Sequence, residues 1–468
     1  MNENPDKTSA DKGTSKGSVL LVATFAAFLT PFLGSAVNLA LPAIGKDMNA
    51  SAISLSWVIS SFILSSAIFL LPFGHLADIK GRKKVFSLGI ALFTISTFLI
   101  IFSKSITSLL ILRVVQGLAS AMIFGTSLAI ITSVFPAGER GKAMGINITA
   151  VYLGLSLGPV IGGVLTQYFG WRSIFMFLVP FGIVSLLLIK KRIKTEWAEA
   201  SGEKFDWTGS VIYGASLASF IYGFSKLPSM AGWIFLLSGI VMSVVFIFVE
   251  KRTSHPVFDI RLMLNNRVFT FSGLAALINY SATSAIGFFI SLYLQYLKGH
   301  DARTAGLIMI AQPVAMTILS PIAGRLSDKK NPGVIASSGM AITALGLILL
   351  CFIDENTSTY IIILLMLLLG TGFGLFSSPN SNAIMSSVEK RHLGVASGVV
   401  GTMRMVGQMM SMGIAMMLIA IYLGKSAIVP ETYPGLIAAM RTGFIIFSAL
   451  SVLGIFASLA RNSKLNRS

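Results

Sequence analysis

The chain has 468 residues, of which 54% are hydrophobic and only 12% are charged, and its mean hydropathy is +0.81. Soluble domains carry about 25% charged residues, so this composition excludes a soluble globular protein and predicts an all-α polytopic membrane protein. The formal net charge of +18 does not indicate nucleic-acid binding, because Lys and Arg occur in short clusters between apolar segments rather than in a basic domain. The single cysteine, Cys351, excludes an intrachain disulfide.

Fourteen apolar segments are each long enough to cross a bilayer, which takes about 20 residues. The first of them is too long for a signal-peptide core and lacks a cleavage site, so we expect it to remain in the protein as the first span. The seventh and eighth are the weakest predictions, because the connection between them is short. The predicted spans are 18–42, 54–77, 84–103, 107–131, 143–166, 173–190, 207–226, 231–249, 269–296, 304–325, 333–353, 358–380, 394–423 and 438–460.

The distribution of basic residues predicts the orientation of these spans, because cytoplasmic loops hold an excess of Lys and Arg. With the N-terminus inside, 26 of the 36 Lys and Arg fall in cytoplasmic segments and 7 in outside loops. The remaining three, Arg113, Arg404 and Arg441, lie within predicted spans. We therefore expect both termini in the cytoplasm, and a multi-pass protein of a prokaryotic inner (plasma) membrane.

Two short motifs recur at a nearly constant separation. Asp78 in Gly-His-Leu-Ala-Asp and Asp328 in Gly-Arg-Leu-Ser-Asp are 250 residues apart, and the Gly-x-Ala-x-Gly motifs at 141–145 and 394–398 are 253 apart. This repeat predicts two six-helix halves with two helices inserted between them, an architecture typical of transporters. The predicted divisions are a cytoplasmic tail (1–17), an N-terminal six-helix half (18–190), a cytoplasmic linker (191–206), two inserted helices (207–250), a second linker (251–268), a C-terminal six-helix half (269–460) and a tail (461–468).

Five further motifs lie at or within the spans. They are Gly-His-Leu-Ala-Asp-Ile-Lys-Gly-Arg-Lys-Lys at 74–84, Leu-Arg-Val-Val-Gln-Gly at 112–117, Gly-Leu-Ser-Leu-Gly-Pro-Val-Ile-Gly-Gly at 154–163, Phe-Asp-Trp-x-Gly at 205–209 and Tyr-Leu-Gln at 293–295. With these motifs the chain resembles the major facilitator superfamily, specifically its fourteen-span drug/proton antiporter branch (the multidrug efflux type), over nearly its whole length.

The resemblance implies that the motif at 74–84 is a conformational latch on the cytoplasmic face, closed in the outward-facing state. Gly74 and Gly81 permit a tight turn, and Asp78 can accept hydrogen bonds from helix N-terminal amides or pair with Arg82. The second copy, at Asp328, is incomplete, and we expect a weaker latch there. The alternative is a basic loop that only sets orientation.

In the motif of the fifth span, Gly154, Gly158 and Gly162 lie on one helix face, where small residues allow close backbone contact. Pro159 in mid-span predicts a kink. The resemblance implies that this segment, which ends in Gly163, is the hinge and seal that favour export by antiport. The alternative is an ordinary tight helix crossing.

Charged residues inside a membrane are costly, and they indicate function by default. Arg113 and its neighbour Gln116 lie in the fourth span, with Arg113 about 9 Å from the outer end of the helix. Arg404 lies deeper, in the thirteenth span. We interpret these three residues as coupling or cavity residues; the alternative for Arg113 is an arginine whose side chain extends to the outer interface.

The first span departs from the family pattern. Members of this branch usually carry an Asp in the first span, in the pattern Asp-x-Thr-x-x-Asn-x-Ala-Leu-Pro, and that position is Leu33 in this chain. None of the 18 Asp and Glu lies near the centre of a predicted span. A cationic cargo would therefore lack a counter-ion, and we expect neutral or anionic cargo, with coupling through Asp78 or through competition around Arg113.

These observations predict a secondary active transporter that exports small amphipathic or lipophilic compounds by alternating access. We expect proton antiport, function as a monomer, and no enzymatic activity, cofactor or metal. Two alternatives remain: an uptake symporter or uniporter of a small neutral or anionic solute, and a non-transporting membrane sensor. The candidate residues for the substrate cavity, each equally expected to hydrogen-bond another helix, are Asn38, Tyr152, Asn279, Gln312 and Asn380.

Overall fold

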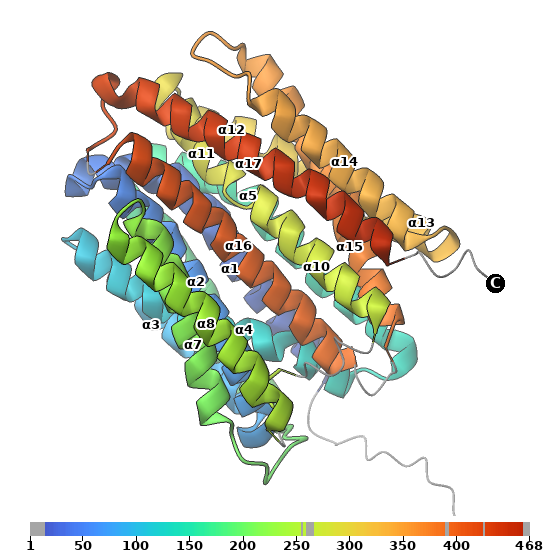
Figure 1. Ribbon diagram of the computed structural model, residues 1–468. Coiled ribbons are helices and arrows are strands. Elements are labelled where there is room, and N and C mark those ends of the chain that lie inside the picture. The colour runs from blue at the N-terminus through green and yellow to red at the C-terminus, as the bar shows by residue number, and fades with distance from the viewer. Residues whose placement is uncertain (1–14, 254–255, 259–265, 389–392, 425, 462–468) are drawn as a thin grey trace, which may run out of the picture.

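The computed structural model describes residues 15–253, 256–258, 266–388, 393–424 and 426–461 (Figure 1). Within these ranges every regular element is a helix. The elements are α1 (Lys16–Met48), α2 (Ala52–Lys80), α3 (Arg82–Ile100), α4 (Ile106–Val134), α5 (Ala137–Phe169), α6 (Arg172–Arg192), α7 (Trp207–Lys226), α8 (Met230–Arg252), α10 (Arg267–Thr283), α11 (Ile286–Leu292), the π-helical η1 (Tyr293–Leu297), α12 (Ala302–Met309), α13 (Ala311–Lys329), α14 (Pro332–Leu350), α15 (Thr359–Ser386), α16 (Leu393–Tyr422), the 3₁₀ turn η3 (Pro430–Thr432) and α17 (Tyr433–Ala460).

Thirteen helical segments in the described part are long and apolar enough to cross a membrane. They match thirteen of the predicted spans, with α10–η1 and α12–α13 each forming one crossing. The seventh predicted span, α7, has 20 residues but is not among the thirteen, because Gly, Ser and Tyr dilute its apolar residues. These small and polar residues are largely buried, since α7 packs along α8 and against α2 and α16.

Two of the predicted spans are interrupted. Between α10 and α11 the backbone leaves the helical pattern, and the free N–H of Ala285 donates to Ser411 Oγ of α16 at 2.9 Å. The second break falls at Ile310, between α12 and α13. Pro313 follows three residues later, and it has no N–H with which to bond the carbonyl of Met309. Sequence hydropathy alone does not detect either interruption.

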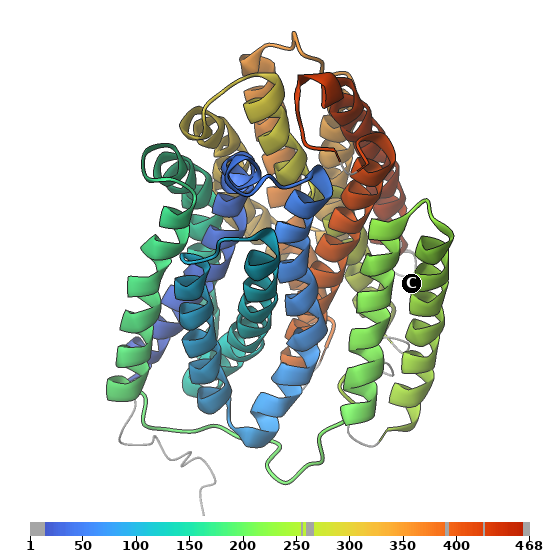
Figure 2. The same cartoon turned by 90° about the vertical axis from the view of Figure 1, so that its left-hand side faces the viewer.

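The helices before and after the α7–α8 hairpin pack in the same pattern. In the first group, α1 packs along α5, α2 and α3 pack along α4, and α3 contacts α6. In the second, α10 packs along α16, α13 and α14 pack along α15, and α14 contacts α17. The α7–α8 hairpin, in green, stands beside the bundle (Figure 2). This shared arrangement is what a duplicated six-helix unit would produce.

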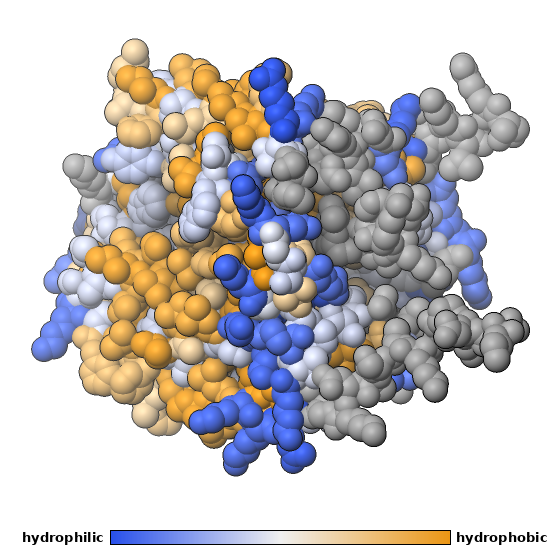
Figure 3. Space-filling view, turned by 90° about the horizontal axis from the view of Figure 1, so that it is seen from below, coloured by the Kyte–Doolittle hydropathy of each residue, from blue (hydrophilic) through white to orange (hydrophobic). Residues whose placement is uncertain are grey.

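We name the two ends of the bundle after residues that lie there. The Arg82 end contains the connections α2–α3 and α4–α5, and the Arg172 end contains the connections α1–α2 and α5–α6. Seen from below, hydrophilic residues gather in a band with hydrophobic residues beside it (Figure 3). Large apolar side chains are also exposed along the sides of the bundle, Trp233 at 54% and Phe248 at 60% among them, as expected for contact with lipid.

Candidate functional site

Arg82 is the centre of a polar network at the Arg82 end. Its Nε donates to Asp78 Oδ1 at 2.7 Å, and its Nη1 donates to Ser133 Oγ of α4 at 2.6 Å. The guanidinium also makes a two-point contact with Glu199, Nη1–Oε1 at 2.7 Å and Nη2–Oε2 at 2.9 Å. The Arg82 side chain is only 9% exposed. A bidentate arginine–carboxylate contact of this kind, here between a buried arginine and an exposed glutamate, favours a fixed geometry of its partners.

The linker that follows α6 covers this network through backbone contacts as well. The Arg82 N–H donates to the carbonyl of Trp197, and the Lys83 N–H donates to Glu196 Oε1 at 2.8 Å, which caps the start of α3. Gly81 has a φ of +113°, and a side chain there would collide with the Glu196 carboxyl. The sequence motif identified Gly81 but not its linker partners, whose only signal was acidic residues in a basic segment.

The two other residues predicted for the latch are Gly74 and Asp328. Gly74 lies where α2 crosses α4, with its backbone close to Gly125. Asp328 lies in the last turn of α13, and its side chain is outside the described residues. A latch contact between the two groups of helices through Asp328 therefore stays a prediction.

Arg113 lies in a closed network among α2, α3 and α4. Its side chain is fully buried: Nε donates to the Val58 carbonyl at 2.9 Å, and Nη1 donates to Gln116 Oε1 at 2.7 Å. Gln116 Nε2 in turn donates to Thr97 Oγ1 at 2.7 Å, and the guanidinium carbon is 4.4 Å from the centre of the Phe62 ring. The side chain does not extend to an interface. The network connects three helices of the first group and does not reach the second.

The glycines of the fifth-helix motif pack α5 against α1. A Cβ added at Gly154 would lie 2.7 Å from the Phe28 carbonyl oxygen, and one at Gly158 would lie 2.7 Å from that of Phe32 and collide with Ser35. A Cβ at Gly162 would meet the Ala36 Cβ at 2.6 Å. The two backbones are therefore in direct contact along two turns.

A second face of the same motif packs against the other group of helices. A Cβ at Gly163 would collide with the carbonyl of Ala302, and a Cβ at Gly306 would collide with the carbonyl of Pro159. Backbone contact between α5 and α12 thus joins the two groups toward the Arg172 end. A spacing pattern within one helix cannot identify Gly306, the partner on α12.

Hydrogen bonds between the two groups reinforce this contact. Arg303 Nη1 donates to the Tyr168 hydroxyl at 3.1 Å, and Ser291 Oγ of α11 donates to the Asn38 carbonyl of α1 at 2.5 Å.

The start of α12 is capped by Asp301. Its carboxyl accepts the N–H of Thr304, and this hydrogen bond to the backbone holds the pKa of the Asp301 carboxyl below its usual value. Asp301 is therefore ionised near neutral pH, where it caps α12.

A cluster of hydroxyl groups lies between the two groups of helices, near mid-bundle. The Tyr152 hydroxyl of α5 is 3.3 Å from both Ser320 Oγ of α13 and Ser377 Oγ of α15. One turn further along α5, Ser156 Oγ is 3.4 Å from Thr317 Oγ1 of α13. Tyr152 is thus the predicted cavity residue that the structure brings together with other polar groups between the halves of the bundle.

Arg404 lies beside this cluster. Its Cα is about 16 Å along α16 from Leu393, which is near the middle of a bilayer core of about 30 Å. The guanidinium carbon is 5.2 Å from the ring centre of Phe124 on α4, in the first group of helices. The Tyr280 hydroxyl of α10 lies within electrostatic range of both Arg404 and Tyr152. The sequence did not single out Phe124 or Tyr280, which are aromatic residues among many.

The remaining predicted cavity residues have other surroundings. Asn380 is 2% exposed; it donates to the Ser272 carbonyl and accepts from Arg461, so its amide joins α10, α15 and the end of α17. Asn279 is fully buried, and neither polar atom of its side chain has a hydrogen-bond partner among the described residues. Asn38 Nδ2 donates to the Gly34 carbonyl of its own helix, and Gln312 is partly buried at the start of α13.

Two carboxyl groups face each other where the α7–α8 hairpin reaches the Arg82 end. Asp206 Oδ1 caps α7 by accepting the Gly209 N–H at 2.8 Å, and Glu250 Oε2 accepts the Phe258 N–H at 3.1 Å. The other oxygens, Asp206 Oδ2 and Glu250 Oε1, are buried without a partner in the described part, and a Cβ at Gly209 would collide with both. Glu250 is 3% exposed although it is close to the end of its helix.

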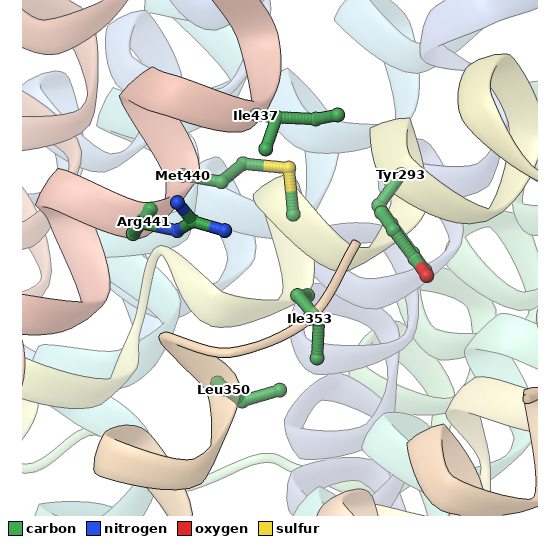
Figure 4. A pocket seen from close by; sticks show the side chains of 6 residues that line it. All are labelled: Tyr293, Leu350, Ile353, Ile437, Met440 and Arg441. Atoms are coloured by element: carbon green, nitrogen blue, oxygen red, sulfur yellow. The ribbon is translucent and has the colours of Figure 1, made fainter. Parts of the chain in front are cut away.

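Two hollows in the protein surface lie away from Arg404. Figure 4 shows a narrow gap lined by Tyr293 and Arg441 among others, with no room for a water molecule. A wider depression of about 550 Å³ lies between the end of α3 and the start of α4, lined by Leu99, Phe102 and Lys104 among others. Both lie toward the Arg172 end. Neither collects convergent polar groups comparable to the Tyr152–Arg404 region.

Comparison with known proteins identifies the family. Residues 23–412 and 273–467 match the family described as the Major Facilitator Superfamily. The chain belongs to the Major Facilitator Superfamily. Among solved structures, a bacterial homologue of the human lysosomal transporter Spinster has a TM-score of 0.66 and 16% identity, and the match covers 96% of this chain and 98% of that one. At this identity the likeness supports the fold.

Several characterised bacterial members of the superfamily are similar over most of their length. The riboflavin transporter RibZ of Clostridioides difficile is 29% identical over 392 residues, covering 83% of this chain and 85% of the relative. The multidrug resistance protein Stp of Mycobacterium tuberculosis is 28% identical, covering 87% and 76%. The cephamycin export protein CmcT of Amycolatopsis lactamdurans is 30% identical, covering 86% and 85%.

These findings confirm the predicted family, fold class and membrane location. The chain is an all-α polytopic membrane protein of the Major Facilitator Superfamily, a transporter family, and its relatives include members of the drug-efflux branch. The prediction of a multi-pass protein of a prokaryotic cell membrane is also confirmed. The cytoplasmic location of the termini, the domain boundaries, the direction of transport, the coupling ion and the roles of individual residues remain predictions.

Proposed function

We propose that this member of the Major Facilitator Superfamily is a secondary active transporter that exports small amphipathic or lipophilic compounds by alternating access. The observation that carries the proposal is the close packing of one helix, α5, on two others. The motif at 154–163 packs α5 on α1 within its own group and on α12 of the other group. Such a helix can transmit movement between the groups, and the same motif carries the resemblance to exporters.

The proposed site of cargo binding is the region between the groups around Tyr152 and Arg404. In transporters built from repeats, binding sites lie near the bilayer midplane at the interface of the repeats. Leu33, which replaces the usual acid of the first span, is fully buried and packed in the apolar core. Tyr152 lies against serine hydroxyls, and Arg404 adds a guanidinium, which supports neutral or anionic cargo rather than a cation.

We further propose that the Arg82 end faces the cytoplasm, as the excess of basic residues there predicts. On this orientation the α5–α12 contact closes the bundle toward the outside. Asp78, which we predict as a coupling residue, is part of the Arg82 network and 40% exposed, so it is within reach of cytoplasmic protons. Export coupled to proton entry is therefore the mode that we propose.

A second candidate function is uptake of a small solute, and it is compatible with one relative, the riboflavin transporter RibZ. The name riboflavin transporter gives no direction of transport. Names that do so, such as cephamycin export protein, belong to other relatives of similar identity. The alternative therefore differs from our proposal in direction rather than in fold.

The test is transport in proteoliposomes with a known orientation of the protein. A fluorescent neutral amphipath, N-phenyl-1-naphthylamine, is added together with an imposed pH gradient, and the internal pH is followed with a trapped dye. We expect probe movement from the Arg82 side to the Arg172 side, with protons moving in the opposite direction. Movement of probe and protons in the same direction would favour a symporter. Movement of the probe without any proton flux would favour a uniporter.

A further inference from the structure

Arg404 differs from two buried arginines of this chain, Arg113 and Arg461. Arg113 makes two hydrogen bonds through its guanidinium, to a carbonyl and to an amide oxygen. Arg461, at the end of α17, donates to Ser272, Asn380 and Ser458 and to two backbone carbonyls. These are the contacts by which the protein satisfies a buried structural arginine. Arg404, which is partly buried, makes no hydrogen bond through any guanidinium nitrogen within the described residues. Its Nε is buried without a partner, as is that of Arg461, but Arg461 is bonded through both of its other guanidinium nitrogens.

The Arg404 charge also lacks a counter-ion in the part of the chain that the structure describes. The ion pairs found there are Lys16–Glu139, Arg82–Asp78, Arg82–Glu199 and Arg172–Asp47. All of them lie at the ends of the bundle. A guanidinium near mid-bilayer without an anion is energetically costly, and this cost is a reason to expect a functional partner.

The surroundings of Arg404 belong to both groups of helices. Phe124, on α4, stacks within 5.2 Å of the guanidinium from the first group. Tyr280, on α10, is nearby in the second group, and its ring packs edge-on against Phe373 at 5.5 Å. Tyr152 contributes a hydroxyl from α5. A ligand bound here would therefore contact one cation, aromatic faces and hydroxyl groups at the same time.

We infer that Arg404 binds the anionic group of an aromatic cargo, a carboxylate or sulfonate, whose rings lie against Phe124 and Tyr280. A guanidinium fits such oxyanions with two parallel hydrogen bonds, which its unused N–H groups can supply. The inference rests on the proposed function, since it names the class of compound carried at the same site. Because Phe124 and Arg404 belong to different groups of helices, the ligand would contact both groups.

Two probes with the same rings and different charge test the inference. The anion is 1-anilinonaphthalene-8-sulfonate and the neutral counterpart is N-phenyl-1-naphthylamine. Binding is measured by fluorescence titration of the full chain in nanodiscs, with empty nanodiscs subtracted, for the wild type, Arg404→Gln and Arg404→Lys. Arg441→Gln is the matched control, because it removes one arginine charge at the Arg172 end, where Arg441 donates to the Cys351 carbonyl.

We expect the wild type and Arg441→Gln to bind the sulfonate about tenfold more tightly than the amine, as one charge-assisted contact provides. Arg404→Gln should lose this preference, and Arg404→Lys should keep part of it. Affinity for the neutral amine should stay within about twofold in every variant. This unchanged amine affinity shows that a variant is folded, and a thermal unfolding curve provides a second check.

The inference is overturned if the wild type does not prefer the sulfonate, or if Arg404→Gln keeps the preference. Transport of both probes by proteoliposomes is measured in parallel, so that failure of the proposed function is distinguishable. If the wild type transports both probes at equal rates and binds them equally, export stands and the anion site does not. If the sulfonate binds through Arg404 but neither probe is transported, the anion site stands and the transport proposal does not.

Discussion

The Arg82 guanidinium at the start of α3 and the Glu199 carboxylate in the linker after α6 meet through two hydrogen bonds, of 2.7 and 2.9 Å. The arginine belongs to the motif that resembles a latch, and the glutamate belongs to the chain that connects the first group of helices to the α7–α8 hairpin. The linker therefore holds the same arginine that also pairs with Asp78. Any movement of Arg82 toward another partner requires this contact to break.

Replacing Glu199 by Gln should lower the thermal midpoint of unfolding slightly. Arg82 would keep its bonds to Asp78 and Ser133 but lose one charge-assisted partner, and Glu199 is 65% exposed, so solvent screening reduces the loss to about 1 kcal/mol or less. Arg82→Gln should be more destabilising, because the guanidinium donates to four partners: Asp78, the Ala129 carbonyl, Ser133 and Glu199. The measurement is thermal unfolding of purified protein in detergent.

Glu196→Gln is the matched control for this pair. Glu196 accepts a single backbone N–H, from Lys83, and the amide oxygen of Gln can accept the same bond. We expect its midpoint to stay close to that of the wild type. A fall in Glu196→Gln as large as that in Glu199→Gln would mean that linker charge in general, and not the Arg82 contact, sets the stability.

Replacing Gly158 by Ala should separate α1 from α5. The added Cβ would collide with Ser35 and lie 2.7 Å from the Phe32 carbonyl oxygen, so backbone must shift, at a cost of about 1–3 kcal/mol. Gly34→Ala, on α1, is the control, because a Cβ there meets nothing within 4 Å. Unfolding midpoints and probe export are measured for both. An unchanged Gly158→Ala variant would exclude the close crossing.

The architecture could be predicted from hydropathy because most spans are long and apolar, and the motifs could be found because their glycines occur at fixed spacings. The partners of those motifs could not. Glu199 and Gly306 are close in space to Arg82 and Pro159 but distant in sequence, and no periodicity relates them. The break near Ala285 depends on Ser411 of another helix. In each case the missing information is which helices are neighbours.

Substitutions at Arg113 and Gln116 test whether these residues serve only to hold the helices together or also take part in proton coupling. Arg113→Leu should be strongly destabilising, because it leaves Gln116 Oε1 buried without a donor. In the double variant Arg113→Leu/Gln116→Leu both polar groups are removed, and Thr97 keeps its bond to the Phe93 carbonyl. The double variant should therefore be more stable than the single one by about 1–2 kcal/mol. Stability is measured by thermal unfolding.

Transport by the double variant then separates the two roles. If Arg113 only connects α2, α3 and α4, a folded double variant should export the neutral amphipath at a rate close to that of the wild type. Loss of proton-coupled export in a variant that unfolds at the wild-type temperature would instead support the coupling role. A double variant less stable than Arg113→Leu would show that the network is not satisfied in the way the hydrogen bonds indicate.

The carboxyl pair formed by Asp206 and Glu250 should respond to removal of one charge by becoming more stable. Two buried carboxylate oxygens that face each other repel when both are ionised, and in the described residues no cation pairs with either of them. In Glu250→Gln the amide can donate to Asp206 Oδ2 while its oxygen still accepts the Phe258 N–H. We therefore expect the thermal midpoint at pH 8 to rise, by the equivalent of about 1 kcal/mol.

The matched control is Glu355→Gln, in the loop between α14 and α15. It removes one acidic charge elsewhere and should leave the midpoint unchanged. A lower midpoint in Glu250→Gln would contradict repulsion between the two carboxylates.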